Sequence, residues 1–449
     1  MSERGVSRGR VRALVLAALT AFALAVCAPA DALSPNDPGW EFQWAQKLMR
    51  LPAVWDYTTG DPSVVIAVVD TGVNPNIPDI RDALVPGWDF TDGDAILEDT
   101  FGHGTLVTSE LVAQGNNGLA IAGYCWSCKV MPIRVARTGV ADETLIAAGI
   151  RWAVDHGARI INVGFQIEAR GSGPNAVLGD AVRYAVEQGR IVVAGGNTGD
   201  DRLVYPAAFP GVLGVAGTDQ RDALYPWSAR GSWLNLAAPG CHMVIPPSNV
   251  YGELCGTSFT APAVSGIAAL ALSLRPSLTA AEIAGALRST AVPVAGIAGG
   301  RVDAFAALSF LGLLSGPPPP PPPPVSRAKT QAPGTRVTAP VGSRTPAIHF
   351  SRQAHVLFGT VRHLRSIPIV VGGGRLDLRL AAREAEECVM SVASRGRVLI
   401  GTLRGLDELT MKVFLPRGHY TVEVSCSSQR RKDYALALTG LLPDEIRRR

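Results

Sequence analysis

The sequence predicts an α/β protein with a doubly wound, mostly parallel sheet of about seven strands, followed by a small all-β sandwich. Apolar, β-branched runs alternate with amphipathic helical stretches through the first two thirds of the chain. Beyond a proline run, the pattern changes to short strand-like pieces without long helices. At 449 residues the chain is long enough for two domains, one with a large core.

The composition shifts also define the expected domain boundaries. We expect a signal peptide at 1–32, an α/β domain with an N-terminal arm at 33–314, a proline-rich linker at 315–347, a β-sandwich at 348–442 and a basic tail at 443–449. The linker contains an unbroken proline run, which is typical of a semi-rigid spacer, although such a run also suits a groove in a partner.

The N-terminus has the features of a secretory signal. Several arginines precede an apolar run, which ends in small residues before Asp31 and Ala32. This run is too short for a stable membrane span. Cys27 follows Val26, which is larger than the residue that normally precedes a lipid-anchor cysteine. We therefore expect cleavage after Ala32 and a secreted protein, extracellular or periplasmic, without a membrane span.

The composition is globular and indicates no nucleic-acid partner. Hydrophobic residues make up 47% of the chain, and the formal net charge is only +4. The basic clusters at 430–432 and 447–449 are interpreted as solvated ends. We expect a monomer that acts without a nucleic acid.

The cysteines favour disulfide bonds. Signal cleavage leaves an even number of them, which is typical of disulfides in an exported chain. The spacing of Cys125 and Cys128 also occurs in redox sites and in half of a zinc site, but no second cysteine or histidine pair accompanies it. The expected pairs are Cys125 with Cys128, Cys241 with Cys255, and Cys388 with Cys426.

The first elements of the α/β domain lead to an acidic residue. Residues 34–60 are polar with turn formers, and we expect an ordered extended arm there. Residues 63–69 form a β-branched run typical of a strand buried on both faces of a parallel sheet. Asp70 follows, in the crevice where open α/β sheets place their chemistry. By itself, Asp70 also fits a capping residue in a turn.

The next elements place a histidine and an asparagine at element boundaries. A helix is expected from Phe101 to about Ala113, with His103 near its start between two glycines that leave the ring accessible. Asn197 follows a strand and lies beside glycines, which suits a turn residue or a side-chain donor at a strand end. The remaining expected strands are 129–135, 159–163, 191–194, 212–215 and 233–237, and the remaining helices are 142–156, 176–188 and one capped by Thr279 and Glu282.

Ser258 lies between a glycine turn and an apolar stretch that is expected to be helical. Pro262 is compatible with this helix because it falls in the first turn. A serine at a helix start lies close to unpaired backbone N–H groups, which suits an oxygen nucleophile that develops negative charge. The same position also suits an N-cap, and the local sequence does not decide between the two.

The C-terminal region is predicted to be a sandwich without a catalytic cluster. Its apolar and polar residues alternate over several short stretches. The expected strands are 356–361, 367–371, 376–380, 388–392, 398–403, 409–414, 420–426 and 434–438.

Together, four residues resolve the local alternatives. Asp70, His103 and Ser258 occur in the order of one known class of catalytic triad, with Asn197 between the last two. Residues 68–72, 102–105, 194–197 and 256–262 match signatures of the subtilisin-like serine proteases (subtilases, peptidase family S8), and residues 34–310 resemble that family.

The resemblance implies a secreted serine endopeptidase that hydrolyses peptide bonds through an acyl-enzyme. His103 would take the proton of Ser258, Asp70 would orient the imidazole, and Asn197 would stabilise the oxyanion. Peptides or proteins would be the substrates. The alternative is a non-catalytic binding or adhesion protein on the same scaffold, but such a protein would be expected to lose one of these side chains. The residues expected to bind substrate are Gly164, Phe165, Gly195 and Gly196.

The specificity pocket departs from the family pattern. Many subtilases have a serine-leucine-glycine segment there, whereas this chain has the segment 162–166, Asn-Val-Gly-Phe-Gln. The residue preferred before the scissile bond is therefore not implied by the resemblance. Residues 415–424 are similar to the pre-peptidase C-terminal domain of secreted bacterial proteases.

The chain is most similar to the thermitase-like branch, which implies structural calcium. The ligands implied below are all oxygen atoms, which suit a hard cation such as calcium. Solvated acidic residues in a turn would give the same sequence pattern. The first site would use the side chains of Asp37, Asp79 and Asn117 with the carbonyls of Gln114, Leu119 and Ile121, and a second loop would use Asp89 and Asp94.

Overall fold

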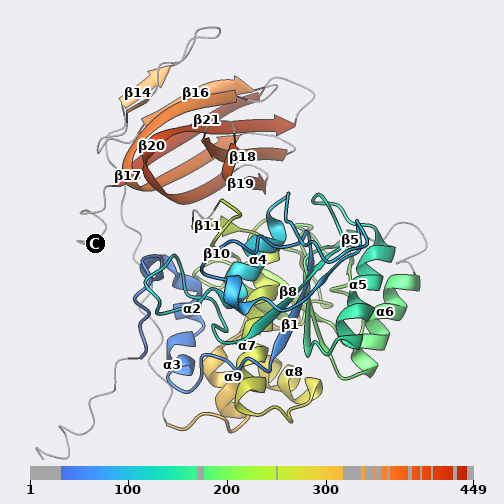
Figure 1. Cartoon of the computed structure of the whole chain (residues 1–449). Helices are drawn as coiled ribbons and strands as arrows, with labels where there is room; N and C mark the ends of the chain where they lie inside the picture. The colour runs from blue at the N-terminus through green and yellow to red at the C-terminus, as the bar shows by residue number, and fades with distance from the viewer. Residues whose placement is uncertain are drawn as a thin grey trace, which may run out of the picture.

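The computed structural model describes residues 32–168, 176–248 and 251–316, together with the strands between residues 335 and 441. The predicted signal peptide, most of the predicted linker and the basic tail lie outside the described residues. Figure 1 shows an α/β region that carries the helices and, beyond it, a region of long antiparallel strands.

A nine-stranded sheet forms the centre of the α/β region, in the order β12-β13-β9-β8-β6-β4-β1-β3-β2. All neighbouring strands run parallel except β12 and β13. The six strands expected from the sequence are present, but the observed sheet is larger than the predicted one of about seven strands, because the two-residue strands β2, β12 and β13 carry no readable sequence pattern. The strands are β1 (Val65–Asp70), β2 (Trp88–Asp89), β3 (Lys129–Arg134), β4 (Ile160–Val163), β6 (Ile191–Gly195), β8 (Leu213–Thr218), β9 (Leu236–Pro239), β12 (Val292–Pro293) and β13 (Gly300–Arg301).

Helices cover both faces of this sheet because its strands are apolar on both faces. Along β1, Ile66 and Val68 belong to one buried cluster, whereas Ala67 and Val69 belong to another. Helices α5 and α6 pack into the second cluster, and α4, α7, α8 and α9 pack into the first. The helices are α4 (His103–Val112), α5 (Glu143–Asp155), α6 (Ala176–Glu187), α7 (Thr260–Leu274), α8 (Ala280–Ser289) and α9 (Ala304–Phe310).

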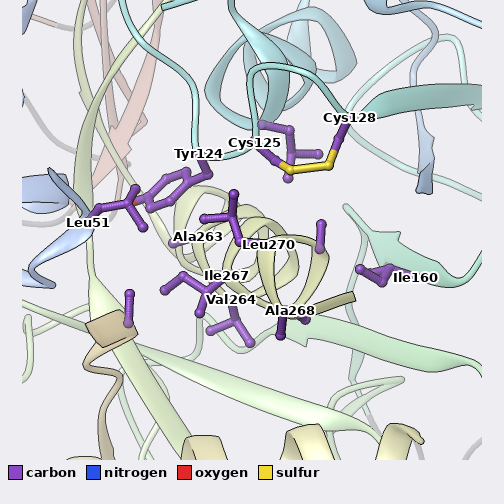
Figure 2. Close-up of a cluster of buried hydrophobic side chains, with 14 of the residues drawn as sticks. Leu51, Tyr124, Cys125, Cys128, Ile160, Ala263, Val264, Ile267, Ala268 and Leu270 are labelled. Atoms are coloured by element: carbon purple, nitrogen blue, oxygen red, sulfur yellow. A yellow bond between two sulfur atoms is a disulfide. The ribbon is translucent and has the colours of Figure 1, made fainter. Parts of the chain in front are cut away.

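Helix α7 is the central helix of the larger cluster. Figure 2 shows its side chains Ala263, Val264, Ile267 and Leu270 among residues from other elements, including Leu51 and Tyr124. Within the described residues, the segment Thr257–Leu274 is long and apolar enough to cross a membrane, but 83% of it is buried inside the protein. Its apolar character is therefore explained by its place in the core.

The N-terminal arm is helical, so the expectation of an extended arm was wrong. It contains η1 (Trp40–Phe42), α2 (Trp44–Leu48) and α3 (Leu51–Trp55). Met49, Leu51 and Val54 are fully buried, and burial of these apolar side chains favours short helices that turn them towards the core. The arm is thus part of the α/β domain.

The C-terminal strands belong to one mostly antiparallel sheet, in which two pairs of predicted strands are each merged into one long strand, β17 or β20. The expected breaks near Gly372 to Gly374 and near Pro416 to Gly418 lie opposite each other, and the pairing of β17 with β20 continues through both. Strand β18 pairs with the second half of β20, and β21 pairs with the second half of β17. Each long strand therefore pairs with the other long strand and with one further strand. The strands are β14 (Thr335–Thr338), β15 (Ile348–His349), β16 (His355–Val361), β17 (Arg365–Ala382), β18 (Glu387–Ser394), β19 (Arg397–Gly405), β20 (Glu408–Ser427) and β21 (Lys432–Leu441).

A hairpin of the α/β domain joins this second sheet. It consists of β10 (Cys241–Val244) and β11 (Gly252–Cys255), and β11 pairs antiparallel with β20. The Phe414 ring lies 4.9 Å from the Tyr251 ring and 4.7 Å from the Phe42 ring, between ring centroids. The α/β region and the C-terminal sheet are therefore held together at β11 by backbone pairing and by aromatic packing around Phe414.

Two of the three predicted disulfides are confirmed. Cys125 bonds to Cys128, and Cys241 bonds to Cys255 across the hairpin. Cys388 stands directly opposite Cys426 in the β18–β20 register. Such opposed positions lie close together in an antiparallel pair, and the third disulfide stays a prediction.

Asp303 connects the arm to α9, and its replacement by alanine should be costly. Arg50 donates from Nε and Nη2 to Asp303 at 2.9 and 2.5 Å, and the two side chains are only 16% and 10% exposed. Asp303 also accepts a hydrogen bond from Ala306 N at the start of α9. Since breaking a buried pair leaves a charge unpaired, we expect Asp303→Ala to lower the free energy of unfolding by about 3 kcal/mol.

Urea unfolding checks this expectation. Asp180→Ala is the matched control, because Asp180 pairs with Arg183 on the surface, where the side chains are 48% and 65% exposed. Equal losses of stability in the two variants would contradict the role given to Asp303.

Candidate active site

The predicted site residues gather at the carboxyl edge of the parallel sheet. Strands β6, β4 and β1 are neighbours, and Asn197 and Asp70 lie at or just beyond the ends of β6 and β1. His103 opens α4, and Ser258 lies in η3 (Thr257–Phe259), which leads into α7. His103, Asn197 and Ser258 line one cleft with a volume of about 680 Å³. The topology therefore brings together residues that are far apart in the sequence.

Asp70 holds the ring of His103 through two close contacts. His103 Nδ1 lies 2.7 Å from Oδ1 and 2.9 Å from Oδ2 of Asp70. Thr71 N donates to Asp70 Oδ1 at 2.7 Å, and the Asp70 side chain is fully buried. Burial lowers the pKa of His103, but the negative charge and hydrogen bond of Asp70 outweigh it, so the pKa of His103 is raised. The contact favours the protonated imidazole.

Two glycines allow this close contact. A Cβ on Gly104 would lie 2.1 Å from the carbonyl oxygen of Gly72, and a Cβ on Gly164 would lie 1.9 Å from Asp70 Oδ2. Both distances are far below any real contact, so a side chain at either position would push apart the elements that carry Asp70 and His103. The glycine next to His103 thus serves packing of α4 against the end of β1.

Asp99 organises the start of α4, and this role was not predicted from the sequence. Its Oδ1 accepts hydrogen bonds from Thr71 Oγ1 at 2.9 Å and Gly102 N at 2.6 Å. Its Oδ2 accepts from Thr105 N and Thr105 Oγ1 at 2.8 and 2.7 Å. Asp99 is buried, and its charge also raises the pKa of His103. An acidic residue just before the predicted helix start was the available signal.

Ser258 does not cap a helix. The cap of η3 is Gly256, the cap of α7 is Phe259, and neither makes a side-chain cap hydrogen bond. None of the described residues forms a hydrogen bond with Ser258 Oγ, although Ser258 lines the cleft with His103. The N-cap alternative is therefore wrong, and the role of Ser258 as nucleophile stays a prediction.

Asn197 is held through its main chain. Gln166 Oε1 accepts a hydrogen bond from Asn197 N at 2.7 Å, and Gln166 Nε2 donates to Asn197 O at 3.0 Å. None of the described residues bonds to the Asn197 side-chain amide, and Asn197 is exposed. Gln166 belongs to the segment 162–166 that departs from the family pattern, but it was not predicted to be a site residue.

Three of the four residues predicted to bind substrate line the cleft. These are Gly164, Phe165 and Gly195, whereas Gly196 is not among the lining residues. A Cβ on Gly196 would meet the Trp233 ring at 2.9 Å and Ala229 at 3.0 Å, so this glycine serves packing.

The residues predicted for the first calcium site lie together at the base of the arm. Asp37 accepts hydrogen bonds from Asn116 N and Asn117 N at 2.6 and 3.2 Å, and Asn117 Nδ2 donates to Asp79 at 2.7 Å. Burial raises the pKa of Asp79 to about 6, and the charge of Asp37 adds to this rise. Asn117 turns its Nδ2 to Asp79, and its Oδ1 accepts a hydrogen bond from Leu119 N at 2.7 Å. The two buried carboxylates are therefore the side-chain oxygens that fit calcium, and a cation would relieve their repulsion.

The residues of the second predicted calcium loop fit a cation poorly. The Asp89 carboxylate lies 2.6 Å from Arg134 Nη1 and also accepts from Thr91 N and Oγ1. Asp94 Oδ1 accepts from Ile96 N at 2.8 Å. A cation at Asp89 would have to displace the guanidinium that already neutralises it. We derive no role for calcium in this loop.

Clusters of three or more acidic, histidine or cysteine ligands are absent from the described residues. The first predicted site has only two carboxylates and would otherwise rely on amide and carbonyl oxygens. A calcium site of this kind is identified from its oxygen ligands and does not require a cluster of three acidic residues.

The comparisons with known proteins agree with this geometry. Residues 61–327 match the model of the subtilase family, peptidase S8. Thermitase from Thermoactinomyces vulgaris is 36% identical over 285 residues, covering 62% of this chain and 100% of thermitase. Halolysin from Haloferax mediterranei is 35% identical over 283 residues, covering 60% of this chain and 53% of halolysin.

Solved structures show the same fold. A protease from Pseudoalteromonas arctica superimposes with a TM-score of 0.57 at 29% identity, covering 62% of this chain and 99% of that protease. A lanthipeptide protease superimposes with a TM-score of 0.57 at 22% identity, covering 63% of this chain and all of that protease.

The α/β region with this carboxyl-edge cleft is that of a serine-type peptidase. The chain belongs to the subtilase family, and it is a serine-type endopeptidase.

Removing the charge of Asp99 should change both the stability of α4 and the titration of His103. Since Asp99 raises the pKa of His103, Asp99→Asn should lower it. The variant also weakens charge-assisted hydrogen bonds to backbone donors, which should lower the free energy of unfolding by about 2 kcal/mol. An NMR titration of the imidazole and a denaturant curve measure the two effects.

Asp94→Asn is the control for this change. Asp94 belongs to the same region of the chain but accepts a hydrogen bond only in an exposed turn. A His103 pKa that stays unchanged or rises in Asp99→Asn would refute the electrostatic role of Asp99.

Proposed function

We propose that Asp70, His103 and Ser258 form the catalytic triad of a secreted endopeptidase that cleaves peptide bonds through an acyl-enzyme. The observation that carries this proposal is the bond between His103 Nδ1 and the buried Asp70 carboxylate, at 2.7 Å, in a cleft that Ser258 also lines. In this arrangement Nδ1 is occupied by Asp70, which leaves Nε2 to act on the serine.

The proton transfers follow from this arrangement. His103 Nε2 takes the proton from Ser258 Oγ as the oxygen attacks the carbonyl carbon of the scissile bond. The imidazolium that forms is stabilised by Asp70, which stays ionised. His103 then gives the proton to the leaving amine, and the acyl group remains on Ser258 Oγ. Water, activated by the same imidazole, releases the acid and restores the serine.

Asn197 and the backbone N–H of Ser258 are the donors proposed for the oxyanion. Negative charge develops on the carbonyl oxygen during attack, and fixed donors lower the energy of that state without reorganisation. The support is that Asn197 lines the same cleft and that its side-chain amide has no partner within the described residues.

Export and calcium complete the proposal. The N-terminal apolar run and the two disulfides support a location outside the cytosol, extracellular or periplasmic. Asp37, Asp79 and Asn117 would hold a calcium ion together with carbonyls of Gln114, Leu119 and Ile121. When bound, the cation supplies positive charge that ties the arm to the loop after α4. Peptides and proteins are the proposed substrates.

The nucleophile is tested by Ser258→Ala. A fluorophosphonate should label the native protein at Ser258 and block casein cleavage, whereas Ser258→Ala should show neither labelling nor cleavage. We expect the loss of activity to be at least about 10⁴-fold, because no other oxygen replaces the nucleophile.

The melting temperature of Ser258→Ala should stay near that of the native protein, which shows that the variant folds. Cleavage by the folded variant at a similar rate would overturn the assignment. A correctly matured native protein that neither cleaves nor is labelled would instead support the non-catalytic binding or adhesion protein.

Calcium binding is tested by melting temperature, measured in the Ser258→Ala background to avoid self-digestion. Excess calcium should stabilise the protein relative to a chelator, by about 2.7 kcal/mol at a hundredfold excess over Kd. Asp79→Ala should lose this difference, because it removes one of the two buried carboxylates.

Asp82→Ala is the control, since Asp82 lies close in sequence but its side chain is 75% exposed and pairs with Arg81. A melting temperature of the native protein that is indifferent to calcium would rule out the site.

A further inference from the structure

We propose that Gln166 determines the specificity of the cleft and positions Asn197, an inference that rests on the proposed function. The first observation is that one side-chain amide satisfies both main-chain polar groups of Asn197. In the described part of the chain these two groups bond to Gln166 alone. Because Asn197 is exposed at a strand end, the amide is what fixes its backbone.

The register of the sheet shows what this bridge replaces. Strands β4 and β6 pair in parallel up to Val163, which stands opposite Ala194. Continuing both chains by three residues gives Gln166 opposite Asn197. The two backbones no longer pair there, and the primary amide of Gln166, which has the donor and acceptor of a peptide group, makes the missing pair of hydrogen bonds.

The bridge therefore forms part of the cleft wall beyond the ends of β4 and β6, where Gln166 and Asn197 are both lining residues. Gly164 and Gly195 line the same cleft without side chains of their own, and a Cβ at these positions would meet Asp70 Oδ2 at 1.9 Å and Thr257 O at 2.6 Å. Gln166 therefore supplies two methylene groups and an amide to this part of the cleft wall, and its hydrogen bonds to Asn197 hold them in place. In a cleft where Ser258 attacks beside Asn197, the side chain before the scissile bond has to enter next to this bridge. This part of the cleft thus favours small side chains, such as alanine, over phenylalanine.

The same contact acts on the chemistry through Asn197. A main chain held by two hydrogen bonds keeps the Asn197 amide aimed into the cleft, and small displacements of such a donor are costly in rate. Gln166 is a positioning residue in this respect, because it touches Asn197 and does not itself touch the reacting atoms.

Two variants separate the two roles. Gln166→Gly removes both the bulk and the hydrogen bonds, whereas Gln166→Met keeps a side chain of similar length without donors or acceptors. The substrates are two peptides that differ only in alanine or phenylalanine before the scissile bond. Active sites are counted by fluorophosphonate labelling, so that rates are compared per competent enzyme.

For Gln166→Gly we expect the ratio of kcat/KM for the phenylalanine peptide to that for the alanine peptide to rise at least about tenfold. For both variants we expect kcat on the alanine peptide to fall about tenfold or more, with a smaller change in KM. Gln188→Gly, the same change at an exposed glutamine after α6, should alter neither quantity.

An unchanged peptide preference in Gln166→Gly overturns the specificity role, and an unchanged kcat in Gln166→Met overturns the positioning role. Failure of the native protein to take the fluorophosphonate label is a different outcome, because it rejects the proposed function before Gln166 is tested. Melting temperatures close to the native value show that the variants are folded.

Discussion

The close approach of α4 to the end of β1 is the constraint on which the rest of the site depends. His103 reaches the Asp70 carboxylate only because Gly104 lets the helix pack against the carbonyl of Gly72. Asp99 then fixes the first turn of the helix through backbone donors. A buried carboxylate, a glycine contact and a capping acid thus set one imidazole in one orientation, and the cleft is built around that ring.

Much of the fold was predictable because the signals are strong and local. The apolar, β-branched run before Asp70 and the capping box at Thr279 and Glu282 correspond to β1 and α8 as observed. The two-residue edge strands were not predictable, because no period is visible in two residues. The helical arm was predicted as extended, since its helices depend on burial of Leu51 and Val54 against distant elements. The merged strands β17 and β20 likewise depend on their irregular positions facing each other.

In the candidate site, too, residues with local sequence signals were predicted and residues that depend on distant contacts were not. Asp70, His103, Asn197 and Ser258 were found from motifs, because each lies at a strand end or a helix start. Asp99 and Gln166 were not, since their roles exist only in three dimensions. Asp99 joins Thr71 after β1 to the start of α4 through hydrogen bonds. Gln166 bonds to the Asn197 main chain where β4 and β6 no longer pair. Sequence motifs identify the reacting groups more readily than the residues that hold them.

The hairpin of β10 and β11 has a consequence for how the protein meets other extended chains. Leu254 and Cys255 at the end of β11 line the cleft, while Gly252 and Glu253 just before them pair with β20. A free sheet edge beside a cleft that accepts extended peptides would offer a second place for a passing strand to add. Strand β20 already fills that edge, so this stretch of the hairpin is closed to strand addition by a substrate or by another copy of the protein.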